Sequence, residues 1–571
     1  MKDYMTIYKE WLENPYFDEA TKEELCAIEG DENEIKERFY MDLEFGTAGL
    51  RGIIGAGINR MNIYTVRRAT QGLANYIIKQ GGAAKGVAIA FDSRHMSPEF
   101  AMEAAMTLAA NGIKAYKFES LRPTPELSFA VRELGCIAGI NITASHNPPE
   151  YNGYKVYWED GAQITPPHDK NILAEVAKVN DYEQMKTMDY DKAVTDGFIK
   201  VIGKEIDDAY IAELKKQNIH PEAITKVAKD IKIVYTPLHG TGNIPVRRVL
   251  AELGFENVYV VEKQEKPDGN FPTVAYPNPE DSKAWTLALE LAKEKDADIV
   301  LATDPDADRL GVYAKDEKTG EYVSFTGNMS GSLIAEYILR EKKEKGELPE
   351  NAAIVETIVT TDMLKAVAEK YGVKLMEVLT GFKFIGEQIK LFEQNNSYEY
   401  IFGMEESYGC LAGTYARDKD ACVAVMMLCE VAAYYKLKGM TLCDAMQDMY
   451  KEYGYYKEGL FTITKKGIDG AEQIENMMRE KRENPATVMG GFKVLKMRDY
   501  QSDEVKDMVT GETGTTGLPK SNVLYYELEN NAWCCVRPSG TEPKIKFYYG
   551  VKGESLEDAE KKLEAIKEDL I

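Results

Sequence analysis

The chain has 571 residues, of which 44% are hydrophobic and 29% are charged, and its formal net charge at pH 7 is −24. At about 150 residues per domain, this length predicts three to five domains with the composition of an ordinary globular protein. The negative charge argues against a nucleic-acid partner, because duplex binding needs a basic face. An anionic ligand would therefore have to be attracted by local positive groups.

The first predicted elements are helices in residues 1–40, where Trp11, Tyr16 and Phe17 would anchor an extension that caps the first domain. Residues 63–79 carry apolar side chains at helical spacing. Residues 86–91 read as a strand. Ser97 and Pro98 then open a helix as N-cap and first residue, and Asn111-Gly112 closes it.

This alternation continues to residue 142 and predicts an α/β domain with a mixed sheet. A charged region of weak pattern, 168–228, separates it from a second set of strands and helices. That set runs from 231–235 through 258–260 to the segment 298–302. A third set follows Gly327; it includes 353–355, a helix from Asp362, the strand 374–378 and a long helix over 421–436.

After Gly454 the pattern changes to that of a smaller α+β domain. Residues 511–517 form a predicted glycine and threonine loop. Segments 523–528 and 533–536 flank Asn530-Asn531 as a hairpin, and 556–571 form a terminal amphipathic helix.

The eight cysteines show neither a C-x-x-C spacing nor a histidine spacing suited to zinc, which predicts buried free thiols in a reducing compartment. The N-terminus, Met1-Lys2-Asp3-Tyr4, lacks the apolar region of a signal peptide. No apolar run reaches the length of about 18 residues needed to span a bilayer. We therefore expect a cytoplasmic protein without membrane association.

The segment Thr143-Ala144-Ser145-His146-Asn147-Pro148-Pro149 places a hydroxyl beside an imidazole. It follows the apolar run 137–142, which reads as a buried strand, and the two prolines stiffen it. Catalytic groups are often displayed on such loops. Most serine–histidine pairs in loops are nevertheless inert, so this segment alone is weak evidence.

A second loop, Thr303-Asp304-Pro305-Asp306-Ala307-Asp308-Arg309, offers three carboxylates at alternate positions. Hard oxygen ligands suit Mg²⁺ or Ca²⁺ better than zinc. An EF-hand is excluded because Arg309 stands at its glycine position and Lys315 at its closing glutamate. A solvated acidic turn is the alternative, but three carboxylates this close repel one another unless a cation binds.

Two further segments follow apolar runs. Glu405 and Ser407 in Gly403-Met404-Glu405-Glu406-Ser407 can hydrogen-bond adjacent hydroxyl groups of a ligand. The segment Arg537-Pro538-Ser539-Gly540-Thr541-Glu542-Pro543-Lys544 has the donors of a phosphate clamp, although a plain turn stays open. The chain lacks a G-x-x-x-x-G-K-[ST] loop, which disfavours a nucleotide-hydrolysing enzyme.

In this order and separation, the four loops resemble those of the α-D-phosphohexomutases, the phosphoglucomutase/phosphomannomutase family. Segments 45–52 and 417–420 share the resemblance, which spans roughly residues 40 to 550 and is closest to the longer members of the family. It implies three related α/β domains with mixed sheets and a smaller α+β domain around a central cleft. We place them at 1–215, 216–326, 327–454 and 455–571.

The resemblance also implies the chemistry. Ser145 would carry a phosphoryl group and, with Asp304, Asp306 and Asp308, hold one Mg²⁺. His146 and Lys155 would transfer protons, although Lys155 could also be an ordinary surface lysine. Arg51 would bind the transferring group from the opposite side. The expected substrate-binding residues are Arg309, Thr380, Gly381, Glu405, Ser407, Lys419, Arg537, Ser539, Gly540 and Thr541.

The implied reaction interconverts glucose 1-phosphate and glucose 6-phosphate through glucose 1,6-bisphosphate, without an obligatory protein partner. Met404 replaces the usual glycine of a Gly-Glu-x-Ser motif, so mannose, dual-specificity and pentose mutases remain alternatives. A non-catalytic phosphosugar sensor is disfavoured because Ser145 and all three aspartates are present. Segments 92–94 and 239–242 are assigned structural support, and a hinge near Gly454 would let the last domain open and close.

Overall fold

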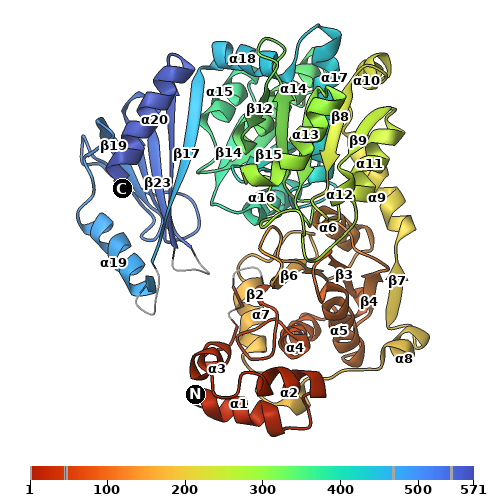
Figure 1. The fold of residues 1–571 in the computed structure, drawn as a ribbon. Helices are drawn as coiled ribbons and strands as arrows, with labels where there is room; N and C mark the ends of the chain where they lie inside the picture. Colours follow the sequence, from red (N-terminus) through yellow and green to blue (C-terminus); the bar gives the residue numbers. More distant parts are fainter. Residues whose placement is uncertain (1–2, 44, 47–48, 466–469, 540–543, 571) are drawn as a thin grey trace.

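The structure is a computed structural model that describes residues 3–43, 45–46, 49–465, 470–539 and 544–570. Figure 1 shows three helices at the N-terminal end, three β-sheets with helices around them, and a fourth sheet at the C-terminal end. The predicted class, three α/β domains followed by a sheet-rich domain, is confirmed. No helix in the described ranges is long and apolar enough to cross a membrane.

The N-terminal extension consists of α1 (Tyr4–Glu13), α2 (Glu19–Cys26) and α3 (Glu32–Phe39). Its aromatic anchors are buried: the Trp11 and Phe17 rings stack with centroids 4.1 Å apart. Trp11 also meets the ring of Tyr64 on the next helix, edge to face. The predicted helical cap is therefore confirmed, and aromatic packing holds it on the first domain.

The first sheet has the order β1-β2-β6-β5-β3-β4-β7 among the described strands. Its four strands β5, β3, β4 and β7 are parallel, whereas β6, β2 and β1 add antiparallel pairs at one side. The strands are β1 (Phe45–Gly46), β2 (Gly49–Ile53), β3 (Val87–Phe91), β4 (Ala115–Phe118), β5 (Ala138–Ile142), β6 (Tyr151–Trp158) and β7 (Ile199–Ile202).

Helices cover this sheet because its central strands are buried on both faces, as β3 and β5 are along their whole length. The predicted helix 63–79 is α4, which begins with a capping box made by Asn62 and Thr65. The helices are α4 (Ile63–Lys79), α5 (Ser97–Ala110), α6 (Thr124–Glu133), α7 (His168–Val176) and α8 (Tyr190–Thr195), with short η1 (Ala83–Lys85) and η2 (Tyr182–Gln184).

The second sheet has the order β12-β11-β10-β8-β9 in the described chain, with β10, β8 and β9 parallel. It is entered through α9 (Lys204–Lys216) and α10 (Pro221–Val227). Its strands are β8 (Lys232–Thr236), β9 (Asn257–Val260), β10 (Ile299–Thr303), β11 (Leu310–Lys315) and β12 (Tyr322–Phe325). Its helices are α11 (Asn243–Glu252), α12 (Glu262–Glu265), η3 (Ser282–Trp285) and α13 (Thr286–Lys295).

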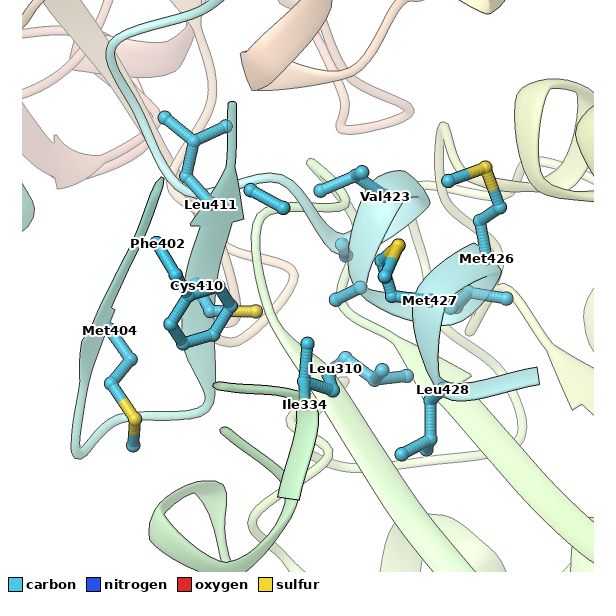
Figure 2. Close-up of a cluster of buried hydrophobic side chains, with 14 of the residues drawn as sticks. Leu310, Ile334, Phe402, Met404, Cys410, Leu411, Val423, Met426, Met427 and Leu428 are labelled. Atoms are coloured by element: carbon cyan, nitrogen blue, oxygen red, sulfur yellow. The ribbon is translucent and has the colours of Figure 1, made fainter. Parts of the chain in front are cut away.

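The third sheet, in the order β14-β13-β15-β16, packs against the second through α17, which is buried almost all round. Its strands are β13 (Ala352–Thr357), β14 (Lys374–Val378), β15 (Glu399–Glu405) and β16 (Gly409–Ala412). Its helices are α14 (Gly327–Glu344), α15 (Asp362–Tyr371), α16 (Phe382–Asn395), α17 (Ala421–Leu437) and α18 (Leu442–Tyr453). Figure 2 shows part of this shared core, with Leu310, Ile334, Phe402, Leu411 and Val423 among the labelled side chains.

The fourth sheet begins with β17 directly after Gly454 and has the described order β17-β24-β23-β22-β19-β20-β21, with β18 beside β19. The predicted hairpin is β22 and β23, joined by η4 (Glu529–Asn531) with Asn530 at φ 60°. Its strands are β17 (Tyr455–Thr464), β18 (Val488–Met489), β19 (Phe492–Asp499), β20 (Glu504–Asp507), β21 (Thr513–Gly514), β22 (Leu524–Leu528), β23 (Trp533–Pro538) and β24 (Lys544–Gly553). Its helices are α19 (Gly470–Glu483) and α20 (Leu556–Leu570).

Three local predictions were wrong. Ser97 is not the N-cap of α5: Met96 holds that position at φ 63°, because the Ser97 hydroxyl donates to Asp92 instead. The region 168–228 is not merely a separator, since it holds α7, which packs on α4, and β7, which completes the first sheet. The 511–517 loop contains β21, a short strand paired with β20.

Candidate active site

The predicted loops leave the carboxyl ends of strands in three different sheets. The serine loop follows β5, the aspartate loop follows β10, and Glu405 is the last residue of β15. In open α/β sheets, ligands bind outside the carboxyl ends of the strands. The fold therefore gathers these segments by the same rule in each sheet.

The serine loop is held by a buried arginine. Arg94 donates from Nη2 to the Ser145 carbonyl at 2.6 Å and from Nη1 to the Pro148 carbonyl at 2.8 Å. Ser145 has φ 52°, and its N–H donates to the Thr143 hydroxyl at 2.8 Å. A non-glycine residue at positive φ persists only where its surroundings hold it, so Arg94 stabilises a strained display of the serine.

The aspartate loop meets the serine directly. The Ser145 hydroxyl donates to Asp304 Oδ2 at 2.9 Å, between residues 159 positions apart in the sequence. Behind the loop, the Thr241 N–H donates to the Pro305 carbonyl at 2.8 Å. Gly240 lies so close that a Cβ there would stand 2.4 Å from Pro305 Cα. The 239–242 segment therefore supports the aspartate loop, the structural role expected for it.

The three aspartates form a group able to hold a metal ion. One carboxylate oxygen from each of Asp304, Asp306 and Asp308 lies within 4.8 Å of the others, and all three residues are buried. Burial and the two neighbouring carboxylates raise the pKa of Asp304 well above its ordinary value. Among the described residues, Oδ1 of Asp306 and Oδ1 of Asp308 accept no hydrogen bond. Unpartnered buried carboxylate oxygens fit a hard divalent cation.

Lys155 lies on β6 and is buried against this cluster. Its Nζ is 2.9 Å from Asp306 Oδ2 and 3.9 Å from Asp308 Oδ2, so it is not an ordinary surface lysine. Burial opposes the charge of Asp306, but the Lys155 ammonium lowers the pKa of that carboxyl below its usual range. The Thr124 hydroxyl donates to the same Oδ2 at 2.8 Å and accepts from Asn141 Nδ2 at 2.7 Å. Sequence reasoning missed both of these supports.

His146 and Arg51 flank the serine. The His146 Nδ1 lies 3.3 Å from the Ser145 hydroxyl, and burial with the nearby charges of Arg309 and Arg51 lowers the pKa of His146 well below its ordinary value. This lowered pKa favours the neutral imidazole over the imidazolium. Arg51 extends from β2 and donates from Nη1 to Asn147 Oδ1 at 3.2 Å.

Lys419 connects the aspartate loop to the segment that holds Glu405 and Ser407. Lys419 Nζ is 3.0 Å from Asp308 Oδ2 and 3.8 Å from Glu405 Oε1, and the Ser407 hydroxyl donates to the same Glu405 oxygen at 2.7 Å. Arg309 donates to Glu280 at 2.5 Å, and its Nε lies 3.9 Å from Asp308 Oδ1. The structure thus brings Glu405, Ser407 and Lys419 together with the aspartates.

Thr380 and Gly381 lie between β14 and α16, with the buried Thr380 hydroxyl unpartnered in the described chain and Gly381 at φ 117°. Arg537 lies on β23 opposite Lys546 of β24. Its charge acts on Glu406, whose pKa burial and Glu405 raise to about 7. Ser539 donates from its N–H to the Lys544 carbonyl at 2.7 Å, while Gly540 and Thr541 lie outside the described residues.

Two lysines near Arg537 were not predicted. Burial lowers the pKa of Lys383 at the start of α16, and burial with the nearby Arg537 charge lowers the pKa of Lys546. Arg537 also contributes to the lowered pKa of Lys383. Arg537 and Lys546 lie on the fourth sheet and Lys383 lies on α16, so no local motif could have revealed their proximity. Together they form a positive region suited to an anion.

In this fold a serine hydrogen-bonded to a cluster of three aspartates that could hold a metal ion lies at the strand ends of the first two sheets, and a cationic region lies near the third and fourth sheets. Family models for phosphoglucomutase/phosphomannomutase match it: alpha/beta/alpha domain I at residues 42–183, domain II at 208–319 and domain III at 326–453. The chain belongs to the phosphoglucomutase/phosphomannomutase family.

Its relatives agree over nearly the whole length. The chain is 36% identical to a phosphoglucomutase of Staphylococcus saprophyticus, over 97% of this chain and 98% of the relative. It is 38% identical to one of Staphylococcus aureus, over 93% and 94%. Among solved structures, it resembles a phosphoglucomutase/phosphomannomutase family protein from Burkholderia thailandensis with a TM-score of 0.62, at 20% identity over 92% and 97% of the two chains. The open form of Paramecium parafusin, a phosphoglucomutase, gives a TM-score of 0.67 at 19% identity over 93% and 94%.

Proposed function

We propose that this protein is a phosphoglucomutase, an isomerase that interconverts glucose 1-phosphate and glucose 6-phosphate. The single observation that carries the proposal is the Ser145 hydroxyl, 2.9 Å from the buried aspartate cluster and with neutral His146 beside it. The family membership and the phosphoglucomutase relatives support the substrate. An activated serine next to a cation-binding cluster suits phosphoryl transfer.

The reaction moves one phosphoryl group in each direction. The phosphoserine at Ser145 gives its phosphoryl group to a free hydroxyl of the sugar phosphate, and the P–O bond to Ser145 breaks. The hydroxyl proton passes to a base, for which His146 and Lys155 are the candidates. The intermediate, glucose 1,6-bisphosphate, then reorients in the site so that its other phosphate faces Ser145. That phosphoryl group is transferred to Ser145. The proton then goes to the oxygen left on the sugar.

The surrounding residues bind and neutralise charge. Arg51 and Arg309 face the transferring group from two sides, and the aspartates with Ser145 would hold one Mg²⁺. When bound, that ion supplies positive charge for the developing phosphate charge. Lys155 and Thr124 both bond Asp306 Oδ2, which leaves Oδ1 free for the metal.

The remaining predicted residues bind the substrate itself. Glu405, Ser407 and Lys419 orient the sugar hydroxyls, and Thr380 with Gly381 lines the same side. Arg537, Ser539, Gly540 and Thr541 hold the phosphate that is not reacting. The positive region of Arg537, Lys383 and Lys546 supports this assignment.

We also propose the domain boundaries 1–215, 216–326, 327–454 and 455–571, each of which encloses one sheet. Reversal of the bisphosphate requires space, so the last domain opens and closes about Gly454, which has φ 117°. A cytoplasmic location, an activating role of glucose 1,6-bisphosphate and the lack of an obligatory protein partner belong to the same proposal.

A coupled dehydrogenase assay on glucose 1-phosphate tests the function, with mannose 1-phosphate and ribose 1-phosphate in parallel. We expect the highest kcat/KM for glucose 1-phosphate. A preference for mannose or ribose would reassign the enzyme within its family, and Met404 at the usual glycine position makes this comparison necessary. Binding of sugar phosphates without any turnover would identify a sensor and contradict the proposal.

A further inference from the structure

The strand that carries Arg51 is bounded by the N-terminal helices. β2 pairs with β6, with Arg51 opposite Gly153 and Gly49 opposite Lys155. Arg51 and Lys155 thus come from adjacent strands at the antiparallel side of the first sheet. Figure 1 shows α1, α2 and α3 grouped below α4, at the end of the molecule where β2 lies.

After β2 the chain makes a turn, residues 55–60, that leads into α4. The turn is fastened to the first domain: Ile54 donates from its N–H to the Glu150 carbonyl at 2.8 Å, and Gly55 to the Met61 carbonyl at 3.1 Å. The Asn62 amide donates to the Gly55 carbonyl at 2.9 Å and to the Gly57 carbonyl at 2.8 Å. Movement of this turn would therefore move the end of β2.

Two charged residues of the N-terminal helices bind the outer side of this turn. Glu24 of α2 accepts from the Ala56 N–H at 3.1 Å, and Arg38 of α3 donates to the Ala56 carbonyl at 3.1 Å. The two side chains also form an ion pair with each other. The Asn59 N–H donates to the Arg38 carbonyl at 3.0 Å. We call Glu24, Arg38 and Ala56 the clasp.

Two glycines of the turn allow its close contact with Glu24 and Arg38. A Cβ at Gly55 would lie 2.9 Å from Glu24 Oε1, and one at Gly57 would lie 2.8 Å from the Arg38 carbonyl oxygen. Both glycines have positive φ, at 155° and 133°, where a side chain is strained. The buried Arg60 adds a pair with Glu37 of α3, Nη2 to Oε1 at 3.2 Å. The helices and the turn are thus in close contact along several residues.

The same turn also holds the chain that enters β1. Leu43 donates from its N–H to the Ile58 carbonyl at 2.8 Å, and its Cδ1 lies 2.7 Å from where a Gly52 Cβ would stand. The family model for the first domain begins at residue 42, so α1, α2 and α3 precede the matched region. Their contacts nevertheless converge on the turn that follows β2, the strand paired with Lys155 of β6.

We propose that the N-terminal helices act as a positioning device for Arg51, with Glu24 and Arg38 as its positioning residues. The proposal rests on the function proposed above. Arg51 is exposed on a short strand, and its guanidinium donates to Asn147 Oδ1 of the serine loop at 3.2 Å. The backbone of β2 sets the point from which this side chain reaches the loop, so a shift of the strand shifts its charge. A displacement of about 1 Å costs a phosphoryl-transfer site up to roughly 10²-fold in rate.

The test compares Arg38→Ala and Glu24→Gln with the control Tyr4→Phe. The Tyr4 hydroxyl donates to Glu32 at 2.7 Å within the same helices, and in the described part of the chain no hydrogen bond joins it to the turn. We expect both clasp variants to lose about ten-fold in kcat with little change in KM. The control should keep the wild-type rate. In the Arg51→Ala background, Arg38→Ala should cost less than about two-fold, because the two residues act through the same guanidinium.

Hydrogen exchange of the folded protein supplies a readout independent of activity. Amides of 49–53 should exchange faster in the clasp variants than in Tyr4→Phe, while those of β3 and β5 stay protected. The proposal would be overturned if Arg38→Ala lowered kcat by the same factor with Arg51 present and with Arg51→Ala. Unchanged amide exchange at 49–53 in the clasp variants would also overturn it. A wild-type protein inactive on every sugar phosphate would refute the proposed function alone, since the exchange result would still decide whether the clasp holds β2.

Discussion

The serine–aspartate centre and the Arg537 region differ in how they are held. Ser145 and the three aspartates are at most 4% exposed, and direct hydrogen bonds join the first sheet to the second around them. Arg537 is only partly buried on the fourth sheet, which lies beside the third in Figure 1. Its described neighbours Lys383 and Glu406 act on it across a boundary between sheets.

This difference matches two physical demands. A reacting centre gains rate when its groups are fixed before the substrate arrives, because the entropy of ordering them is already lost. A site that must release and re-engage a phosphate needs an element that can move. Rigidity at Ser145 and mobility at Arg537 would therefore serve consecutive steps of one reaction, and variants on each side should fail differently.

Ser145→Ala is the strongest test of the serine–aspartate centre. We expect turnover of glucose 1-phosphate to fall by roughly 10³-fold or more, since the group that carries the phosphoryl is lost. Intact-mass measurement should find phosphate on the wild type and none at this position in the variant. The exposed Ser397→Ala serves as the control and should retain full activity. Full activity of Ser145→Ala would contradict the assignment.

Asp308→Asn tests whether the cluster binds a divalent cation. Titration with Mg²⁺ by calorimetry should show affinity reduced by roughly 10²-fold. Even the loss of a residue that only hydrogen-bonds to a metal ligand lowers metal affinity by about ten- to a hundred-fold. The turnover should fall in parallel and recover partly at high Mg²⁺. The exposed Asp448→Asn is the control. Undiminished activity of the wild type after verified removal of metal would refute the metal assignment.

Sequence alone could predict the fixed centre because each of its parts is local. Ser145 and Asp304 follow apolar strands that read clearly from their composition, and parallel strands present their carboxyl ends at one edge. The supports could not be predicted in this way. The bond from Arg94 to Ser145 joins residues 51 positions apart, and that from Thr124 to Asp306 joins residues 182 apart.

The same distinction explains the errors in the fold. β7 has two exposed residues, Lys200 and Val201, between buried ends, so its sequence lacks the alternation of a strand. Ser97 reads as an N-cap, but the buried Asp92 takes its hydroxyl, and Met96 adopts positive φ in its place. The pairing of β7 with β4 is a long-range contact, and the bond from Ser97 to Asp92 joins residues five positions apart; each overrides the expected pattern.

Arg537→Ala tests the Arg537 region, the part of the site for which we propose movement. We expect KM for glucose 1-phosphate to rise about ten- to hundred-fold, since a charge-assisted bond contributes roughly 1.5–3 kcal/mol. The affinity for Mg²⁺ and the phosphate on Ser145 should stay at wild-type levels, because Arg537 lies on the fourth sheet and the aspartates follow a strand of the second. The exposed Lys506→Ala on the same sheet is the control. If kcat fell while KM stayed constant, Arg537 would belong to the reacting centre and the comparison would fail.

The smallest expected effect concerns the contact between the third and fourth sheets. Glu458 of β17 accepts a hydrogen bond from Thr361 beside α15, and burial raises its pKa from 4.5 to about 7. The carboxyls facing it shift in the same direction: burial raises the pKa of Asp362 to about 6 and that of Glu356 well above its ordinary value. This interface is therefore most stable when its carboxyls are protonated.

The sign of the pH dependence follows from these shifts. Below pH 4.5 Glu458 is protonated in both the folded and the unfolded chain, and its stabilising contribution is fully present. As the pH rises toward about 7, ionisation becomes easier in the unfolded chain than at the buried interface, so stability is lost. Thermal unfolding should show this as a midpoint that falls between about pH 5 and pH 8. Glu458→Gln should reduce that fall by a few degrees, while the exposed Glu557→Gln leaves it unchanged. If the unfolding midpoint fell equally with pH in Glu458→Gln and in the wild type, the charge of Glu458 would not govern this contact. The mobility proposed for the fourth sheet would then need another explanation.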